Sequence, residues 1–205
     1  SNLDSIINQK KRIQFEIKEL DRNFYTKSNN NNLIVIKDIE TGRNLNWEIK
    51  IYDRDLNLIN DTIFELDRSY VIHKIHSEKN NYEILFKKNY SNEKEYLYLS
   101  YNTKSNKIQI KEINFPLSIR ISNTLLFKES IVFFGNLKNG KSLVGIYNLS
   151  NRQLKNIYEY LYYDNDIINI YKNRDESFYV LIANRGKNGN EIIEKKSYNL
   201  KGEEI

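Results

Sequence analysis

The first residues to weigh for chemistry form the string GNLKNGKS, from Gly135 to Ser142, which matches the phosphate-binding pattern G-x-x-x-x-G-K-[ST]. A phosphate-binding loop needs a strand before it and a helix after it, so that the helix N-terminus faces the phosphates. Here an apolar run precedes the string, but residues 142–147 (SLVGIY) read as another strand. The Asn-Gly pair inside the string is typical of a hairpin turn. The sequence therefore predicts a hairpin, and a helix over residues 141–152 would reverse this interpretation.

The only two histidines, His73 and His76, form an H-x-x-H pattern, which can bind zinc when both side chains lie on one face. Residues 70–76 (YVIHKIH) alternate like a strand. Side chains three residues apart on a strand point to opposite faces. The spacing therefore predicts no zinc site.

Residues 53–57 (DRDLN) resemble the start of a calcium-binding loop. The next position of such a loop is Gly but here is Leu58, and the twelfth is Glu but here is Phe64. A solvated turn is therefore expected. The absence of cysteine excludes disulfides, thiolate metal sites and a cysteine nucleophile. Two histidines without a G-x-S-x-G motif give no catalytic triad. The sequence predicts no metal, no cofactor and no catalytic residue.

Two recurrences indicate a repeat architecture instead. ELDR occurs at residues 19–22 and again at residues 65–68, each time after an alternating apolar run and before an aromatic residue. A tyrosine followed by Asp or Asn and then a polar turn also recurs, and Asp or Asn stabilises such a turn by bonding its own backbone. These tyrosines are spaced by 49, 46 and 51 residues, at Tyr52, Tyr101, Tyr147 and Tyr198.

Apolar runs rich in β-branched and aromatic residues predict the strands between these markers. They lie near residues 13–17, 33–37, 45–52, 62–66, 70–76, 82–88, 95–101, 107–115, 119–127, 130–136, 142–147, 154–161, 166–171, 177–183 and 191–198. The strands group into one domain over residues 1–205, with units near 21–66, 67–115, 116–161 and 162–205. Residues 12–20 are expected to complete the last unit.

Four-strand units of this length are typical of propeller blades. The strand-end Tyr-Asp and Tyr-Asn resemble the Trp-Asp dipeptide of WD repeats, and the unit length is similar to that of kelch repeats. The kelch Gly-Gly pair and the WD-repeat Gly-His are missing, so the resemblance is to β-propeller repeats in general and implies no family's function. The expected fold is all-β and β-propeller-like, with about four blades of four antiparallel strands. A two-sheet β-sandwich and another all-β meander are the alternatives.

The chain begins on an outer strand and ends just past a third strand, which suggests how a ring could close. We expect residues 12–19 to pair with the last third strand, near residues 191–198, and so to cover an exposed sheet edge. Deleting residues 1–20 should then abolish stability. A piece of a larger ring is the alternative.

Propellers usually bind ligands on the face that carries the links between units and the turns between second and third strands, an expectation from fold-level analogy. The sequence predicts a non-enzymatic module that recognises a protein or glycan partner there. A hydrolytic, for example carbohydrate-active, enzyme with carboxylates at the channel mouth is the alternative. The predicted ligand-binding residues are Asp21, Arg22, Asp67, Arg68, Arg43, Lys141, Asp164, Arg185 and Lys187.

The composition is that of an ordinary globular chain, with 40% hydrophobic and 29% charged residues among 205. The net charge of +5 raises nucleic-acid binding as a hypothesis, but acidic residues interrupt the basic ones almost everywhere. A steep salt dependence of binding would be its signature. No apolar run spans a membrane. The start at Ser1 without Met suggests an exported, periplasmic or surface-anchored bacterial protein whose lipid anchor is lost, and a cytoplasmic location stays open.

Overall fold

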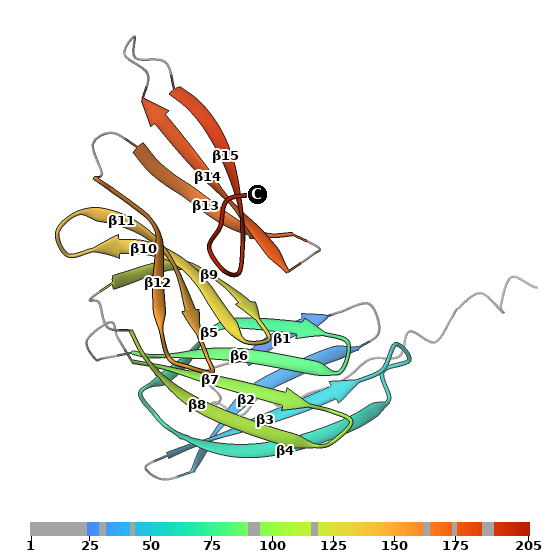
Figure 1. Ribbon diagram of the computed structural model, residues 1–205. Coiled ribbons are helices and arrows are strands. Elements are labelled where there is room, and N and C mark those ends of the chain that lie inside the picture. Colours follow the sequence, from blue (N-terminus) through green and yellow to red (C-terminus); the bar gives the residue numbers. More distant parts are fainter. Residues whose placement is uncertain are drawn as a thin grey trace, which may run out of the picture. The chain divides into compact units, whose positions relative to one another are not determined.

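The computed structural model describes only part of the chain. The described residues are 24–28, 32–41, 44–89, 95–115, 119–161, 165–173, 176–185 and 191–205. Their regular secondary structure is entirely β-strand, as the sequence predicts (Figure 1). Within them, no helix is long and apolar enough to cross a membrane.

The strands form four sheets in which the strand order follows the chain. The first sheet contains β1 (Phe24–Ser28), β2 (Leu33–Thr41), β3 (Asn44–Tyr52) and β4 (Leu58–Asp67). The second contains β5 (Tyr70–Glu78), β6 (Asn81–Lys88), β7 (Glu95–Asn102) and β8 (Lys107–Asn114). The third contains β9 (Ile119–Phe127), β10 (Ser130–Leu137), β11 (Lys141–Asn148) and β12 (Leu154–Leu161). The fourth contains β13 (Asn165–Lys172), β14 (Ser177–Arg185) and β15 (Glu191–Asn199).

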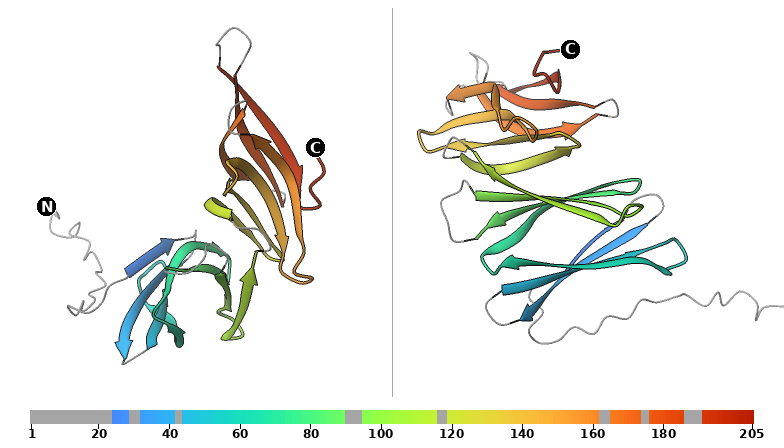
Figure 2. Two further views of the ribbon diagram at one scale, coloured as in Figure 1. Left: turned by 90° about the vertical axis from the view of Figure 1, so that its left-hand side faces the viewer. Right: turned by 60° about the horizontal axis from the view of Figure 1, so that its bottom comes forward.

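This succession of twisted antiparallel meanders is the predicted all-β, β-propeller-like architecture (Figure 2). Three sheets have four strands, and the fourth has three within the described residues. The chain also divides into two compact units, residues 1–89 with 99–109 and residues 90–98 with 110–205, so β7 and β8 contribute to both. The boundaries predicted for the four repeats stay a prediction.

The core of the first unit follows from strand alternation. On β3 the buried side chains Leu45, Trp47, Ile49 and Ile51 alternate with half-buried polar ones. Trp47 meets Phe86 of β6 edge-on, with ring centroids 5.2 Å apart. The first sheet therefore packs against the second through aromatic contacts that add about 0.5–1.5 kcal/mol each beyond burial.

The core of the second unit contains two clusters. Phe115 lies edge-on to three rings, with centroid distances of 5.3 Å to Tyr96, 4.7 Å to Phe133 and 5.2 Å to Tyr147. The other cluster joins the third and fourth sheets, which lie face to face (Figure 2). Its buried members are Phe127, Val132, Val144, Ile146, Ile167, Ile170, Phe178, Val180, Ile182 and Tyr198.

The tyrosine that precedes each turn is buried in every sheet, at Tyr52, Tyr101, Tyr147 and Tyr198. The Asp or Asn that follows accepts backbone N–H bonds on its side-chain oxygen, as the sequence predicts. The acceptors are Asp53, Asn102, Asn148 and Asn199, and the donors, at 2.8 to 3.1 Å, are Asn57, Ser105, Ser150 with Asn151, and Lys201 with Glu203. The tyrosine recurrence therefore marks the same kind of turn in all four sheets.

The turn after β15 has the same backbone bonds as the turn after β3. The N–H of Asn199 donates to the carbonyl of Glu203 at 3.0 Å, as the N–H of Asp53 does to Asn57. Glu204 then forms a bridge with Tyr198 and so begins to pair beside β15. The predicted closure by residues 12–20 lies outside the described residues and stays a prediction.

Candidate functional site

The second copy of ELDR lies where the first sheet leads into the second. Asp67 ends β4, and its Oδ1 accepts bonds from the backbone N–H of Ser69 at 2.8 Å and from the Ser69 hydroxyl at 2.5 Å. These two bonds, with a smaller contribution from the charge of Lys88, hold the pKa of Asp67 below its usual value. The carboxylate therefore stabilises the link between sheets. Asp21 and Arg22, in the first copy, lie outside the described residues.

Basic side chains gather at the same end of the second sheet. Lys87 and Lys88 end β6 and pair with Val71 and Tyr70 at the start of β5. The ammonium group of Lys88 lies 6.0 Å from the centre of the Tyr70 ring. Arg68, which is exposed, immediately precedes this strand. The end of the sheet that carries the predicted residues Asp67 and Arg68 thus also carries Lys87 and Lys88, together with Glu95, the first residue of the neighbouring strand β7.

The remaining predicted residues lie at the corresponding ends of other sheets or outside the described residues. Lys141 is the first residue of β11, and Arg185 is the last residue of β14, so both flank the turn between second and third strands. The structure places these two residues on the expected end of their own sheets and does not join them into one site. Arg43, Asp164 and Lys187 lie outside the described residues.

The GNLKNGKS string is a hairpin turn between β10 and β11. The N–H of Gly140 donates to the carbonyl of Leu137 at 3.0 Å, and Gly140 has a φ of 80°. The Ser142 hydroxyl donates to Asn136 Oδ1 across the two strands at 3.0 Å. A strand, not a helix, follows the turn, so the structural context of a phosphate-binding loop is missing and the predicted hairpin is confirmed.

The DRDLN segment is also a turn. Both carboxylate oxygens of Asp53 accept bonds from Asn57, at 2.8 Å from its backbone N–H and 3.0 Å from its side-chain amide. Across the part of the chain that the structure describes, no three His, Asp or Glu side chains gather in a way that could hold a metal ion.

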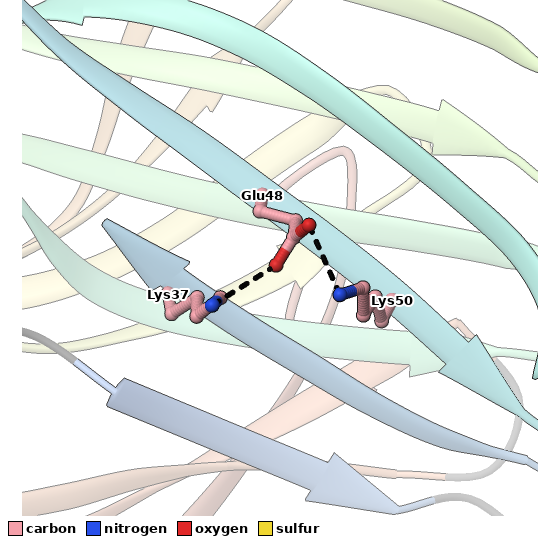
Figure 3. Close-up of polar contacts among 3 residues, drawn as sticks. All are labelled: Lys37, Glu48 and Lys50. Atoms are coloured by element: carbon pink, nitrogen blue, oxygen red, sulfur yellow. Dashed lines mark ion pairs between the residues drawn. The ribbon is translucent and has the colours of Figure 1, made fainter. Parts of the chain in front are cut away.

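The carboxylate of Glu48 lies between two ammonium groups on a half-buried face of the first sheet, as Figure 3 shows. It is 3.4 Å from Lys37, its neighbour on β2, and 3.0 Å from Lys50 on its own strand. Opposite charges paired across strands stabilise sheet pairing by a fraction of a kcal/mol to about 1 kcal/mol. The arrangement is therefore explained by the sheet itself.

A bulge in the first strand of three sheets is the feature that the sequence reading missed. Opposite a regular second strand, one extra residue is inserted in β5, β9 and β13. The extra residues are His73, Ser122 and Ile168. Bulges redirect side chains and are frequent beside binding sites. Strict strand alternation, which would place the two histidines on opposite faces, therefore does not hold at His73.

The bulges of the second unit are joined by a pair of asparagines. Asn123 donates its side-chain amide to Asn169 Oδ1 at 2.7 Å. Each Oδ1 also accepts the N–H of the following residue, at 2.8 Å from Thr124 and 2.9 Å from Ile170. The two asparagines thus fix the backbone at the bulges of neighbouring strands.

The bulge of the first unit carries cations instead. His73 and Lys74 are half-buried on β5, Lys87 is half-buried on β6, and Lys27 is exposed on β1, which lies against β5. Burial lowers the pKa of His73, and the charges of Lys87 and Lys74 lower it further. Burial also lowers the pKa of Lys74, and Lys27 acts in the same direction. Residues with shifted pKa values are frequent at functional sites, and ordinary packing also shifts pKa values.

No known protein family and no curated protein sequence matches this chain. Solved structures with a partly similar fold include an ACO/RPE65 chimera, with 8% identity and a TM-score of 0.46. A mutant of Synechocystis apocarotenoid oxygenase has 9% identity and a TM-score of 0.46, and cobalt-substituted Synechocystis ACO has 9% and 0.45. Each match covers 85% of this chain and 45% of the other, so the chain spans less than half the length of those proteins. Likeness at this level assigns neither a family nor an activity.

Proposed function

We propose that this chain is a non-enzymatic binding module that recognises a protein or glycan partner through the sheet ends that carry the links between sheets. One observation supports the proposal above the others: Arg68, Lys87 and Lys88 gather at one end of the second sheet. Among the described residues at this end, these three cations outnumber the two carboxylates, Asp67 and Glu95.

The charge at this end favours an acidic partner. Arginine and lysine bind carboxylate groups through charge-assisted hydrogen bonds. Charges at the rim of an interface chiefly raise the association rate and select the partner, and salt screens them. The module is therefore expected to bind acidic segments or acidic sugars more tightly at low ionic strength.

The test measures binding of two fluorescent probes, a hexaglutamate peptide and a hyaluronan hexasaccharide, by anisotropy. The variant Lys87→Glu/Lys88→Glu should weaken binding of at least one probe about tenfold or more, a loss of about 1.4 kcal/mol. The matched control is Lys104→Glu/Lys107→Glu, because these exposed lysines lie at the opposite end of the same sheet and change the net charge equally.

If the two variants weakened binding equally, the effect would depend only on the net charge of the protein, and the proposed surface would be wrong. A single-stranded oligonucleotide serves as a third probe. Preferential binding of the oligonucleotide, with a steep salt dependence, would favour a nucleic-acid binder and contradict the proposal. Export of the protein stays a prediction from the sequence.

A further inference from the structure

We infer that the outer edge of β15 is the docking site for a second copy of this chain, through antiparallel pairing of β15 with the β15 of that copy. β15 is an outer strand of the fourth sheet (Figure 1). Within the described residues this sheet has three strands, whereas each of the other sheets has four. An uncovered sheet edge is a template for pairing with another strand. The inference goes beyond the proposed function and does not depend on it, because it concerns a different sheet.

The last residues of the chain cover one end of this edge and show which backbone groups point toward it. The carbonyl of Ser197 accepts the N–H of Ile205 at 3.0 Å, and the N–H of Asn199 donates to the carbonyl of Glu203 at 3.0 Å. Ser197 and Asn199 therefore direct these backbone groups away from β14. Beyond Ile205, no strand among the described residues lies beside β15.

The regular register of β15 extends this pattern to the open part of the edge. β15 pairs with β14 from Glu191 to Asn199 without a shift. In an antiparallel sheet, alternate residues of a strand direct both their N–H and their C=O to the same side. Glu191, Ile193 and Lys195 therefore present their backbone groups to the open edge, as Ser197 and Asn199 do.

These three positions are complementary to themselves when a second β15 runs in the opposite direction. With Ile193 on a twofold axis, Ile193 of one copy is opposite Ile193 of the other, and Glu191 is opposite Lys195 on either side of the axis. Apolar pairs and residues of opposite charge at opposed positions stabilise strand pairing. Moving the axis to Glu194 would instead oppose two residues of like charge, which destabilises pairing. The edge thus favours one symmetric register, as an interface between identical copies requires.

The exposure of the apolar side chains at this edge agrees with such pairing. Ile192 is 59% exposed and Ile193 is 67% exposed. Pairing of two copies would remove part of this apolar surface from water, which is favourable. Lys195 is also exposed, and its ammonium group lies 4.5 Å from the centre of the Tyr179 ring. Because a few residue pairs form only a small interface, we expect a weak dimer.

Sedimentation velocity of the full chain over a range of about 5 to 500 µM tests the dimer, because association depends on concentration by mass action. We expect the weight-average mass to rise from that of the monomer toward that of the dimer. A monomer over the whole range would overturn the inference. It would favour the competing prediction that residues 12–20 of the same chain cover this edge.

Charge reversal tests the register. Lys195→Glu opposes two carboxylates on either side of the axis and should weaken the dimer about tenfold. Glu191→Lys/Lys195→Glu restores opposite charges and should restore the dimer. The single and the double variant both lack the contact of Lys195 with Tyr179, so a merely structural effect would persist in the double variant and overturn the register. Lys104→Glu, at an exposed turn of the second sheet, changes the net charge as Lys195→Glu does and should leave the dimer intact.

Crosslinking tests the position of the axis. The chain has no cysteine, so a single introduced cysteine reports on one site. In the inferred register the Cα atoms of the two Ile193 residues are about 5.5 Å apart, a distance that a disulfide can bridge. Mild oxidation should therefore link Ile193→Cys into a covalent dimer. Ile110→Cys is the control, because Ile110 is 43% exposed on β8 and should crosslink far less. Equal crosslinking of the two variants would overturn the inference.

Discussion

Replacing Gly135 with alanine tests how the bulge of the third sheet is built. Gly135 lies on β10 at the point where its pairing with β9 shifts by one residue. A Cβ atom added there would lie 2.2 Å from the carbonyl oxygen of Arg120 and 2.9 Å from the Cα of Ile121. Both atoms belong to the backbone of β9, so no side-chain rotation can relieve the contact.

The size of the expected effect follows from that overlap. Backbone atoms would have to move by nearly 1 Å, and overpacking of this kind costs about 1–3 kcal/mol and sometimes more. Because the displaced strand also carries sheet hydrogen bonds, we expect a loss of about 3 kcal/mol or more in the free energy of unfolding. For a chain of this length, a loss of 3 kcal/mol lowers the melting temperature by roughly 6–12 °C.

Urea unfolding followed by far-UV circular dichroism measures the loss. Gly140→Ala is the control in the same hairpin. Its added Cβ would meet no atom within 4 Å, but its φ of 80° strains any residue with a side chain, which costs about 1 kcal/mol. If Gly135→Ala unfolds within about 1 kcal/mol of the unchanged protein, or if Gly140→Ala is the more damaging, the account of the bulge is wrong.

Three smaller perturbations test the turns and titrating groups. Asn148→Ala removes the acceptor of two backbone N–H groups and should lower the free energy of unfolding by about 1 kcal/mol in urea, whereas no change would show that water replaces the side chain. Ser69→Ala should raise the pKa of Asp67 toward its ordinary value in an NMR titration, and an unchanged pKa would contradict the hydrogen-bond account. The stability that ionised Asp67 contributes is present above its unfolded pKa and is lost as pH falls through the lower folded pKa. Because the folded pKa of His73 is lowered, the unfolded chain binds a proton at His73 near pH 6.5, before the folded protein does. In chloride buffer the free energy of unfolding should therefore decrease as pH falls from about 6.5 to the folded pKa. His73→Gln should lessen that decrease, and identical pH profiles of the two proteins would refute the account.

The strands and turns could be predicted because they depend on local patterns. Buried tyrosines at strand ends and the Asp or Asn after them have a physical role within a few residues of chain, as at Tyr147 and Asn148. Alternation of apolar residues located the strands with errors chiefly at their ends. β4, for example, begins at Leu58, whereas the sequence predicted a strand from Thr62. Leu58 and Ile59 are exposed, so burial gives no signal there.

The bulges could not be predicted by the same means. A bulge depends on the register between two strands, and the identity of a residue such as His73 does not show that it will be the extra residue of a bulge. A weak signal does exist in three tetrads, IHKI at 72–75, ISNT at 121–124 and IINI at 167–170, whose spacings of 49 and 46 residues follow the repeat. Because these tetrads recur at the repeat spacing, they mark the position of the bulge in the first strands of three sheets.

The candidate site was predictable only in part for a related reason. The sequence placed Asp67 and Arg68 at a sheet end, and the structure has them there. It could not place Lys27 near Lys74, because that proximity depends on how β1 packs against β5. Charge clusters assembled from separate strands have no counterpart in residue spacing.

The GNLKNGKS string shows how a literal motif match can be explained without its usual chemistry. Gly135 is required by the closeness of the Arg120 backbone, and Gly140 by its positive φ. Ser142 is engaged across the hairpin by Asn136. The two glycines and the serine of the string therefore each have a role in the hairpin that involves no phosphate.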